Sequence, residues 1–162
     1  MRLGPYFECG ITLSSEQLLG SSSSAAIVVR SIVAYSDGIR LSWSFHTRRP
    51  LGDAWDELTN GQRPGSLKIS YGYLADGPPP FQAPVVWPET SSVESELLSA
   101  AGGDGDFAEC TVTLWVSPRK PGTFRLAALW PDEGISQVLH DYAIPTDEQC
   151  SEKVVKIYRQ AS

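Results

Sequence analysis

The sequence has no long hydrophobic run and no excess of positive charge. None of its apolar stretches approaches the ~20 residues that a membrane helix needs, and the N-terminus, MRLGPYFECG, lacks the apolar segment of a secretory signal. The 162 residues include 13 Lys and Arg against 19 Asp and Glu, a formal net charge of −6. Without a membrane helix or a signal, we expect a cytoplasmic protein. Because an acidic surface repels phosphate backbones and anionic lipids, we expect it to bind neither nucleic acid nor a membrane.

Cysteine motifs are lacking as well. The three cysteines, Cys9, Cys110 and Cys150, lie far apart, and no two of them have the close spacing of a zinc knuckle. An odd set of widely separated cysteines in a cytoplasmic protein is typical of reduced, mostly buried thiols. We therefore expect no structural zinc site.

The acidic segment GGDGDF, residues 102–107, has the wrong spacing for calcium. Counted from Asp104, an EF-hand loop needs an oxygen ligand at its fifth position and a glutamate at its twelfth, where this chain has Ala108 and Trp115. A glycine-rich calcium repeat needs an aspartate where Phe107 stands. The sequence also has no phosphate-binding loop and no GxSxG nucleophile elbow. It predicts a flexible acidic turn here, and neither a metal nor a cofactor.

The two histidines give a weak metal signal. The pair His140-Asp141 resembles part of an HD-type phosphohydrolase site, but such sites need further His and Asp residues on helices. The other histidine, His46, lies on an expected strand. The two rings could still meet in space with Asp141 or Glu109, although ordinary surface histidines are the favoured interpretation.

What the chain does have is strand patterning, clearest in residues 39–46. The apolar residues Ile39, Leu41, Trp43 and Phe45 alternate with Arg40, Ser42, Ser44 and His46. This period of two predicts a strand with one buried face. A preceding strand, AIVVRSIVAY, is joined to it through Asp37-Gly38, a dipeptide typical of hairpins.

The register of this hairpin follows from its apolar residues. A three-residue loop, with Gly38 at positive φ in a bulge, pairs Tyr35 with Ile39, Val33 with Leu41 and Val29 with Phe45. One face is then apolar on both strands, whereas a two-residue turn breaks that match. We therefore predict the bulged hairpin.

Further strands are predicted over residues 67–73, 110–116, 123–130 and about 137–142, from alternation and from β-branched and aromatic residues. The SPRKPG segment, residues 117–122, is expected to be an exposed turn because it holds two prolines, two cations and a glycine. The serine run at 21–24 and the segment from about 78 to 105 have the composition of loops.

Two helices are predicted. Asp53 and Gly61 bound a short helix near residues 53–60. Thr146 and Gln149 form a capping box before a C-terminal helix over about 147–159. Many strands and few helices predict a mainly β fold, a single-domain antiparallel β-sandwich or open barrel over residues 1–162. A parallel α/β fold would need a helix after most strands.

The tripeptide Trp130-Pro131-Asp132 resembles the acid loop of tyrosine phosphatases, and Trp87-Pro88-Glu89 nearly repeats it. A phosphatase also needs a C-x5-R phosphate cradle, which none of the cysteines begins. Both copies are better explained as strand ends, because proline removes the next ladder donor while the tryptophan packs on the core. The remaining alternative is a ligand surface, for which Trp87, Trp130 and Asp132 are the candidate binding residues.

Aromatic content leaves a second binding hypothesis open. The chain has five tryptophans, Trp43, Trp55, Trp87, Trp115 and Trp130. An exposed aromatic platform on a β-sandwich would suit sugar rings, whereas core and rim packing also explains most of these side chains.

The segments AYSDGIRLSWSF and LWVSPRKPGTFRLAALWPDEGI are similar to a family of uncharacterised actinobacterial proteins. The shared features are an Ala-Tyr-x-x-Gly strand start, a Trp-rich hairpin broken by prolines and a Trp-Pro-x-x-Gly-Ile stop, within residues 25–135. This chain has fewer prolines in SPRKPG than that hairpin. The resemblance implies one β-rich bacterial domain and no particular activity.

We therefore expect an acidic, non-catalytic binding module that recognises another protein or a second copy of itself. The alternatives are a carbohydrate- or small-ligand-binding sandwich and a hydrolase without a recognisable motif. Coplanar exposed tryptophans would favour the sugar, a cleft joining a histidine to carboxylates would favour the enzyme, and a flat apolar patch would favour the protein partner.

Overall fold

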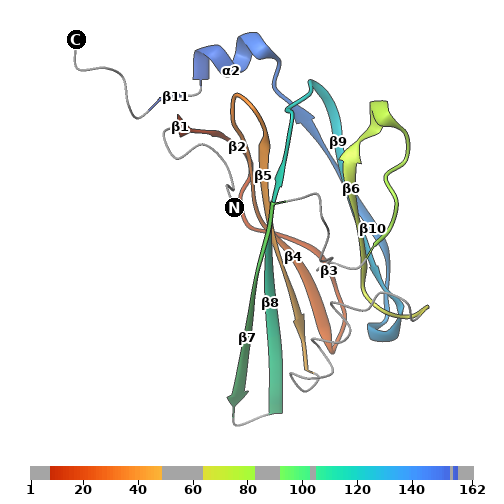
Figure 1. Ribbon diagram of the computed structural model, residues 1–162. Helices are drawn as coiled ribbons and strands as arrows, with labels where there is room; N and C mark the ends of the chain where they lie inside the picture. Colours follow the sequence, from red (N-terminus) through yellow and green to blue (C-terminus); the bar gives the residue numbers. More distant parts are fainter. Residues whose placement is uncertain (1–7, 49–63, 83–91, 103–104, 154, 157–162) are drawn as a thin grey trace.

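The computed structural model describes residues 8–48, 64–82, 92–102, 105–153 and 155–156 (Figure 1). The helix predicted near 53–60 and the candidate Trp87 lie outside these ranges. Within them, no helix combines the length and the apolar character that crossing a membrane requires.

The fold is mainly β, and every pairing between its strands is antiparallel. The strands are β1 Glu8–Cys9, β2 Ile11–Ser14, β3 Gln17–Ser21, β4 Ala25–Ala34, β5 Ile39–Thr47, β6 Lys68–Tyr73, β7 Ser92–Gly102, β8 Gly105–Val116, β9 Gly122–Trp130, β10 Ile135–Ile144 and β11 Val155–Lys156. Short 3-10 turns, η1 Leu74–Asp76 and η2 Pro131–Glu133, and one helix, α2 Asp147–Lys153, complete the described elements.

Two sheets face each other around one core. The larger sheet has the order β2-β4-β5-β8-β7, with β3 also paired to β4, and the smaller sheet has the order β10-β9-β6. Figure 1 shows the smaller sheet packed beside the upper part of the larger one. The core between them includes Trp43 and Phe45 of the larger sheet and Phe124, Leu126 and Trp130 of the smaller one. The predicted antiparallel β-sandwich or open barrel is confirmed.

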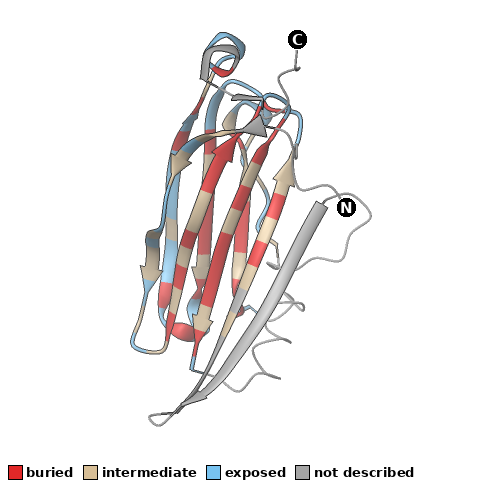
Figure 2. Cartoon of the chain, turned by 90° about the vertical axis from the view of Figure 1, so that its left-hand side faces the viewer, coloured by how far each residue is buried: buried red, intermediate tan, exposed pale blue. Residues whose placement is uncertain are grey.

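The alternation predicted for residues 39–45 is confirmed. Ile39, Leu41 and Trp43 are 0% exposed and Phe45 is 1% exposed. Figure 2 shows the same banding of buried and less buried positions along neighbouring strands. Burial of one complete face explains why this segment was the strongest strand signal in the sequence.

The predicted register of the β4–β5 hairpin is wrong. Ile39 pairs with Ala34 and not with Tyr35, and Tyr35 N donates to Gly38 O at 2.8 Å across a connection formed by residues 35–38. The glycines with positive φ in the described residues are Gly77, Gly122 and Gly134, so Gly38 does not have the expected conformation.

A bulge at Arg30 explains the difference. The register shifts between Val29 and Ser31, so the inward-facing positions of β4 change parity there. Ile27 and Val29 face the core before the bulge, and Ile32 and Ala34 face it afterwards, all at 0% exposure. A single continuous register, as we predicted, would have turned one of these pairs outward.

The expected loop over 78–105 is only partly correct. Residues 92–102 form β7, which pairs with β8 along its whole length, from Ser92 opposite Trp115 to Gly102 opposite Gly105. The composition of this segment suggests a loop, whereas a long neighbouring strand provides it with a pairing partner. Residues 103–104 of GGDGDF lie outside the described residues, so the predicted acidic turn stays a prediction.

The C-terminal helix begins where predicted but is shorter. Thr146 N donates to Gln149 Oε1 at 2.9 Å and Gln149 N donates to Thr146 Oγ1 at 3.2 Å, which is the reciprocal capping box. Helix α2 then ends at Lys153, and β11 follows and pairs with β1. Cys150 of this helix is a buried thiol at 2% exposure. The side chains of Cys9 and Cys110 lie outside the described residues.

Candidate functional site

Trp130 ends strand β9 and is buried in the core at 1% exposure. Pro131 opens the turn η2, and Gly134, at a φ of 75°, ends it in the left-handed region. Asp132 is exposed, and its backbone N–H donates to Gly65 O at 2.9 Å. The strand-end interpretation is therefore confirmed for this copy. Because its ring is enclosed, Trp130 offers no surface to a ligand.

The described tryptophans do not form a sugar platform. Trp43 is buried like Trp130. Trp115 is partly exposed on the outer face of the larger sheet, where it tilts at 55° against Tyr35 with 5.8 Å between the ring centroids. No two exposed coplanar indoles occur in the part of the chain that the structure describes.

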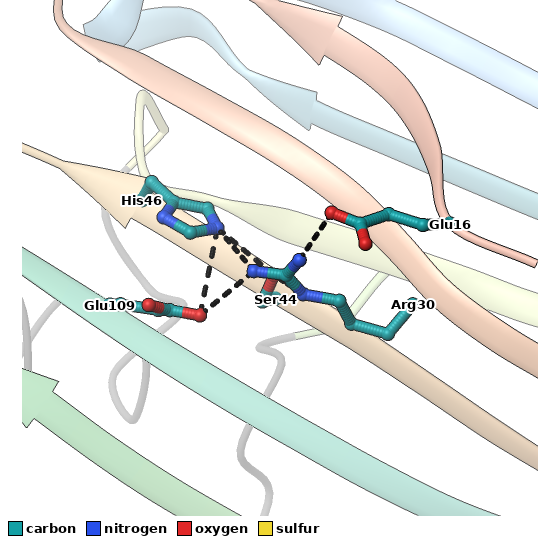
Figure 3. A network of polar contacts seen from close by, with 5 residues as sticks. All are labelled: Glu16, Arg30, Ser44, His46 and Glu109. Carbon is teal, nitrogen blue, oxygen red and sulfur yellow. Dashed lines mark hydrogen bonds and ion pairs between the residues drawn. The ribbon is translucent and has the colours of Figure 1, made fainter.

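His46 lies in a polar cluster on the outer face of the larger sheet, which we call the Arg30 network (Figure 3). Its members are Glu16, Arg30, Ser44, His46 and Glu109. His46 Nε2 lies 3.0 Å from Ser44 Oγ, 3.3 Å from Arg30 Nη2 and 3.8 Å from Glu109 Oε1. Arg30 also donates to Ser44 Oγ at 2.8 Å, to Glu16 at 2.6 Å and to Glu109 at 3.0 Å.

Antiparallel pairing assembles this network from distant parts of the chain. His46 is directly opposite Glu109 in the β5–β8 ladder, so both side chains leave the same face of the sheet. Arg30 reaches them from the bulge in β4, and Glu16 from the turn between β2 and β3. A meeting of His46 and Glu109 was one possibility left open by the sequence. The part played by Arg30 could not be predicted, because it depends on the bulge in β4.

The Arg30 network does not have the geometry of a hydrolytic triad. In a triad the serine and the acid contact opposite nitrogens of the histidine, whereas here Ser44 and Glu109 both lie next to Nε2. Ser44 is 0% exposed, and its oxygen accepts a hydrogen bond from Arg30. Burial lowers the pKa of His46, and the charge of Glu109 opposes this effect. The cluster joins four segments of the larger sheet and does not activate its serine.

The other histidine lies on the smaller sheet, away from His46. The ring of His140 lies against that of Tyr142, with 4.8 Å between the ring centroids and a tilt of 50° between the planes. Asp141 accepts two hydrogen bonds from Arg125, at 2.7 and 2.9 Å, and these bonds lower its pKa. The two histidines therefore do not meet. Among the residues described, no group of three or more His, Cys, Asp or Glu side chains is arranged to hold a metal ion.

A pocket lies between the end of β6 and the turn that joins β8 to β9. Its volume is about 320 Å³. Two tyrosines, three consecutive prolines and a rim of charged residues line most of it: Tyr71, Tyr73, Pro78, Pro79, Pro80, Asp76 and Lys120. This concave, largely apolar surface has the character of a ligand site. No motif in the sequence predicts this pocket.

The prolines explain why the pocket forms. After η1 the chain returns beside β6, but the pairing that the structure shows there is limited to Ile69 and Gln82, with two bonds of 2.8 Å. Pro78, Pro79 and Pro80 have no N–H to donate to the edge of β6, so the ladder does not continue past them. Ser70 Oγ instead donates to Pro79 O at 2.9 Å and holds the proline segment over the sheet.

Polar groups around the pocket are largely bonded to one another. Tyr73 Oη donates to Pro118 O at 3.2 Å and accepts from Lys120 N at 3.1 Å. Lys120 Nζ lies 2.9 Å from Asp76 Oδ2 and 5.7 Å from the centre of the Tyr73 ring. The wall therefore offers ring and proline surface, with one exposed ion pair at the rim.

Arg119 fixes the turn that forms one wall. Its guanidinium donates to Tyr35 O at 3.0 Å, to Pro145 O at 2.7 Å and to Asp147 Oδ1 at 2.5 Å. The side chain is 3% exposed. The prediction that the whole SPRKPG segment is an exposed turn is therefore wrong at this position. Neighbouring Lys120 is exposed, and no local sequence pattern indicates which of the two cations is buried.

Comparison with protein-family models, with curated proteins and with solved structures finds no match to this chain.

Proposed function

We propose that this protein is a non-catalytic binding module that recognises another protein molecule. It would do so by holding one apolar side chain of that partner in the pocket lined by Tyr71, Tyr73 and the three prolines. The observation that carries this proposal is a concave apolar surface whose polar groups are engaged with each other. A pocket of about 320 Å³ is at the small end of the range for ligand sites. It suits a single large side chain better than an extended sugar or a cofactor.

The hydrogen-bond pattern of the pocket supports an apolar occupant. A sugar presents several hydroxyls, each of which loses bonds to water unless the site replaces them. Tyr73 already uses its hydroxyl within the wall, and the three prolines have no donors. Tyrosine and proline surfaces suit an aromatic or aliphatic side chain, in the way that aromatic grooves receive such anchors in peptide recognition.

Selection of random dodecapeptides displayed on phage, with the purified protein as the target, tests the proposal. We expect enriched peptides to share one large apolar residue. Ser117 is exposed and lines the pocket, so Ser117→Trp should fill it and weaken binding of a selected peptide by about tenfold or more in calorimetry. Ser136→Trp, at an exposed serine of β10, is the matched control and should bind normally.

Several outcomes separate this proposal from its alternatives. If Ser117→Trp unfolds, Pro80→Trp, at another exposed lining position, blocks the same pocket. A dimer that either blocking variant dissociates would identify the partner as a second copy of the chain. The proposed function would be refuted if the blocked and control variants bound the peptide with equal affinity. It would also be refuted if oligosaccharides, and no other class of compound, displaced the peptide.

A further inference from the structure

The contacts of His46 favour one protonation state (Figure 3). Arg30 Nη2 lies 3.3 Å from His46 Nε2, and a guanidinium has donors but no acceptor. Nε2 must therefore accept, which requires a neutral ring with its proton on Nδ1. Ser44 Oγ accepts from Arg30 Nε and can donate its own proton to the same ring nitrogen.

A proton on Nε2 is incompatible with these contacts. The N–H would point at a guanidinium 3.3 Å away, and two positive groups would face each other. Glu109 Oε1 lies 3.0 Å from Arg30 Nη2 and 3.8 Å from His46 Nε2, so this oxygen can neutralise either cation. Protonated His46 thus competes with Arg30 for one carboxylate.

Arg30 also ties the turn between β2 and β3 to the sheet. Its Nη1 donates to Glu16 Oε1 at 2.6 Å, and Glu16 is the most exposed member of the Arg30 network, with 69% of its side chain accessible. One guanidinium therefore holds Glu16 on one side and faces His46 and Glu109 on the other. Arg30 stands at the bulge in β4 and has no ladder partner in β5.

We propose that the Arg30 network is a proton-operated latch, in which protonation of His46 moves Glu109 from Arg30 to the imidazolium. Arg30 then loses two of the contacts that orient its guanidinium, and its exposed ion pair with Glu16 weakens, because such a pair contributes little unless its side chains are already held in place. The charged groups that act on the ring are Glu109 from β8, Arg30 from β4 and Glu16 from the β2–β3 turn. Burial and Arg30 lower the pKa of His46 and the two glutamates raise it, with burial the largest effect. The contact between Arg30 and Glu16 is therefore intact at neutral pH and weakens in acid. It is independent of the proposed pocket function.

Nitrogen-detected NMR of the folded protein tests the latch. At pH 8 we expect the Nδ1–H tautomer of His46, and on acidification the Arg30 Nε–H resonance should shift with the same midpoint as the ring. Amide exchange across residues 15–18, corrected for its intrinsic pH dependence, should become faster over that range. Glu109→Gln should lower the His46 pKa, because it removes a charge that raises it.

Two neutral variants provide the controls. His46→Gln keeps an acceptor beside Arg30, so the turn should stay protected into the acid range. Glu16→Gln removes the charge that pairs with Arg30. The amides of residues 15–18 should therefore exchange quickly at every pH, while His46 still titrates. An Nε2–H tautomer of His46 at pH 8 would overturn the proposal. So would an Arg30 Nε–H resonance that does not shift when His46 titrates. A third contrary result would be amide exchange at residues 15–18 that depends on pH in His46→Gln as it does in the wild type.

Discussion

Gly38 lies directly beneath the indole of Trp115. A Cβ added at Gly38 would be 2.4 Å from Cζ2 of that ring, and the rings of Trp115 and Tyr35 are in contact beside it. Gly38 has an ordinary φ, so the absence of a side chain, and not a left-handed conformation, explains the glycine at this position.

The first prediction follows from this contact. Gly38→Ala should destabilise the protein by about 1–3 kcal/mol, because the methyl group overpacks the site. Trp115→Ala should remove most of that penalty, so urea unfolding of the two single variants and the double variant should give a coupling well above zero. Additive effects would show that the indole does not restrict Gly38.

The second prediction concerns Trp130 and its neighbour Asp132. Trp130→Ala should cost about 3–5 kcal/mol of unfolding free energy, because it empties a large volume in the core. Asp132→Asn should cost about 1 kcal/mol or less, since the amide keeps an acceptor oxygen on an exposed side chain. Thermal melts of both variants check the order, and a mild effect of Trp130→Ala would contradict the buried position of the ring.

Arg119 and Lys120 provide the third prediction. Arg119→Ala should destabilise the fold by roughly 3 kcal/mol or more, because it leaves the carbonyls of Tyr35 and Pro145 without their donor. Arg119→Lys should recover only part of this loss, since an ammonium cannot reproduce the planar fork.

Lys120→Ala is the matched control, because the adjacent cation is exposed and forms a surface ion pair with Asp76. It should change the unfolding free energy by about 1 kcal/mol or less. Chemical denaturation of the three variants gives the comparison, and equal losses at the two positions would show that burial does not distinguish them.

The fourth prediction is the pH dependence of stability. Burial lowers the pKa of His46 below its ordinary value of 6.5, so the unfolded chain binds this proton more tightly than the folded one. The stability associated with a neutral His46 is fully present above pH 6.5 and is lost as the pH falls through the lowered folded-state pKa. Urea midpoints between pH 8 and pH 5 should therefore fall more in the wild type than in His46→Gln. Parallel curves would exclude a role for His46.

Elements with local sequence patterns could be predicted from the sequence alone. The alternation at Ile39, Leu41, Trp43 and Phe45 is confirmed because a period of two places one set of side chains on one face wherever the strand pairs. The capping box at Thr146 and Gln149 is confirmed because both partners lie within one turn. Trp130-Pro131 ends β9 as predicted, since proline cannot donate to the ladder in any context.

Features that join distant segments depend on long-range packing. The bulge at Arg30 depends on which residues of β4 the opposite sheet can bury, and a single-strand pattern does not contain that information. Burial of Arg119 and exposure of Lys120 depend on the carbonyls that end β4 and β10, which are remote in sequence. The pocket beside Tyr73 exists because two turns, at Pro78–Pro80 and at Pro118, meet across the end of the smaller sheet. Long-range packing, and not local preference, therefore created both the Arg30 network and the proposed binding site.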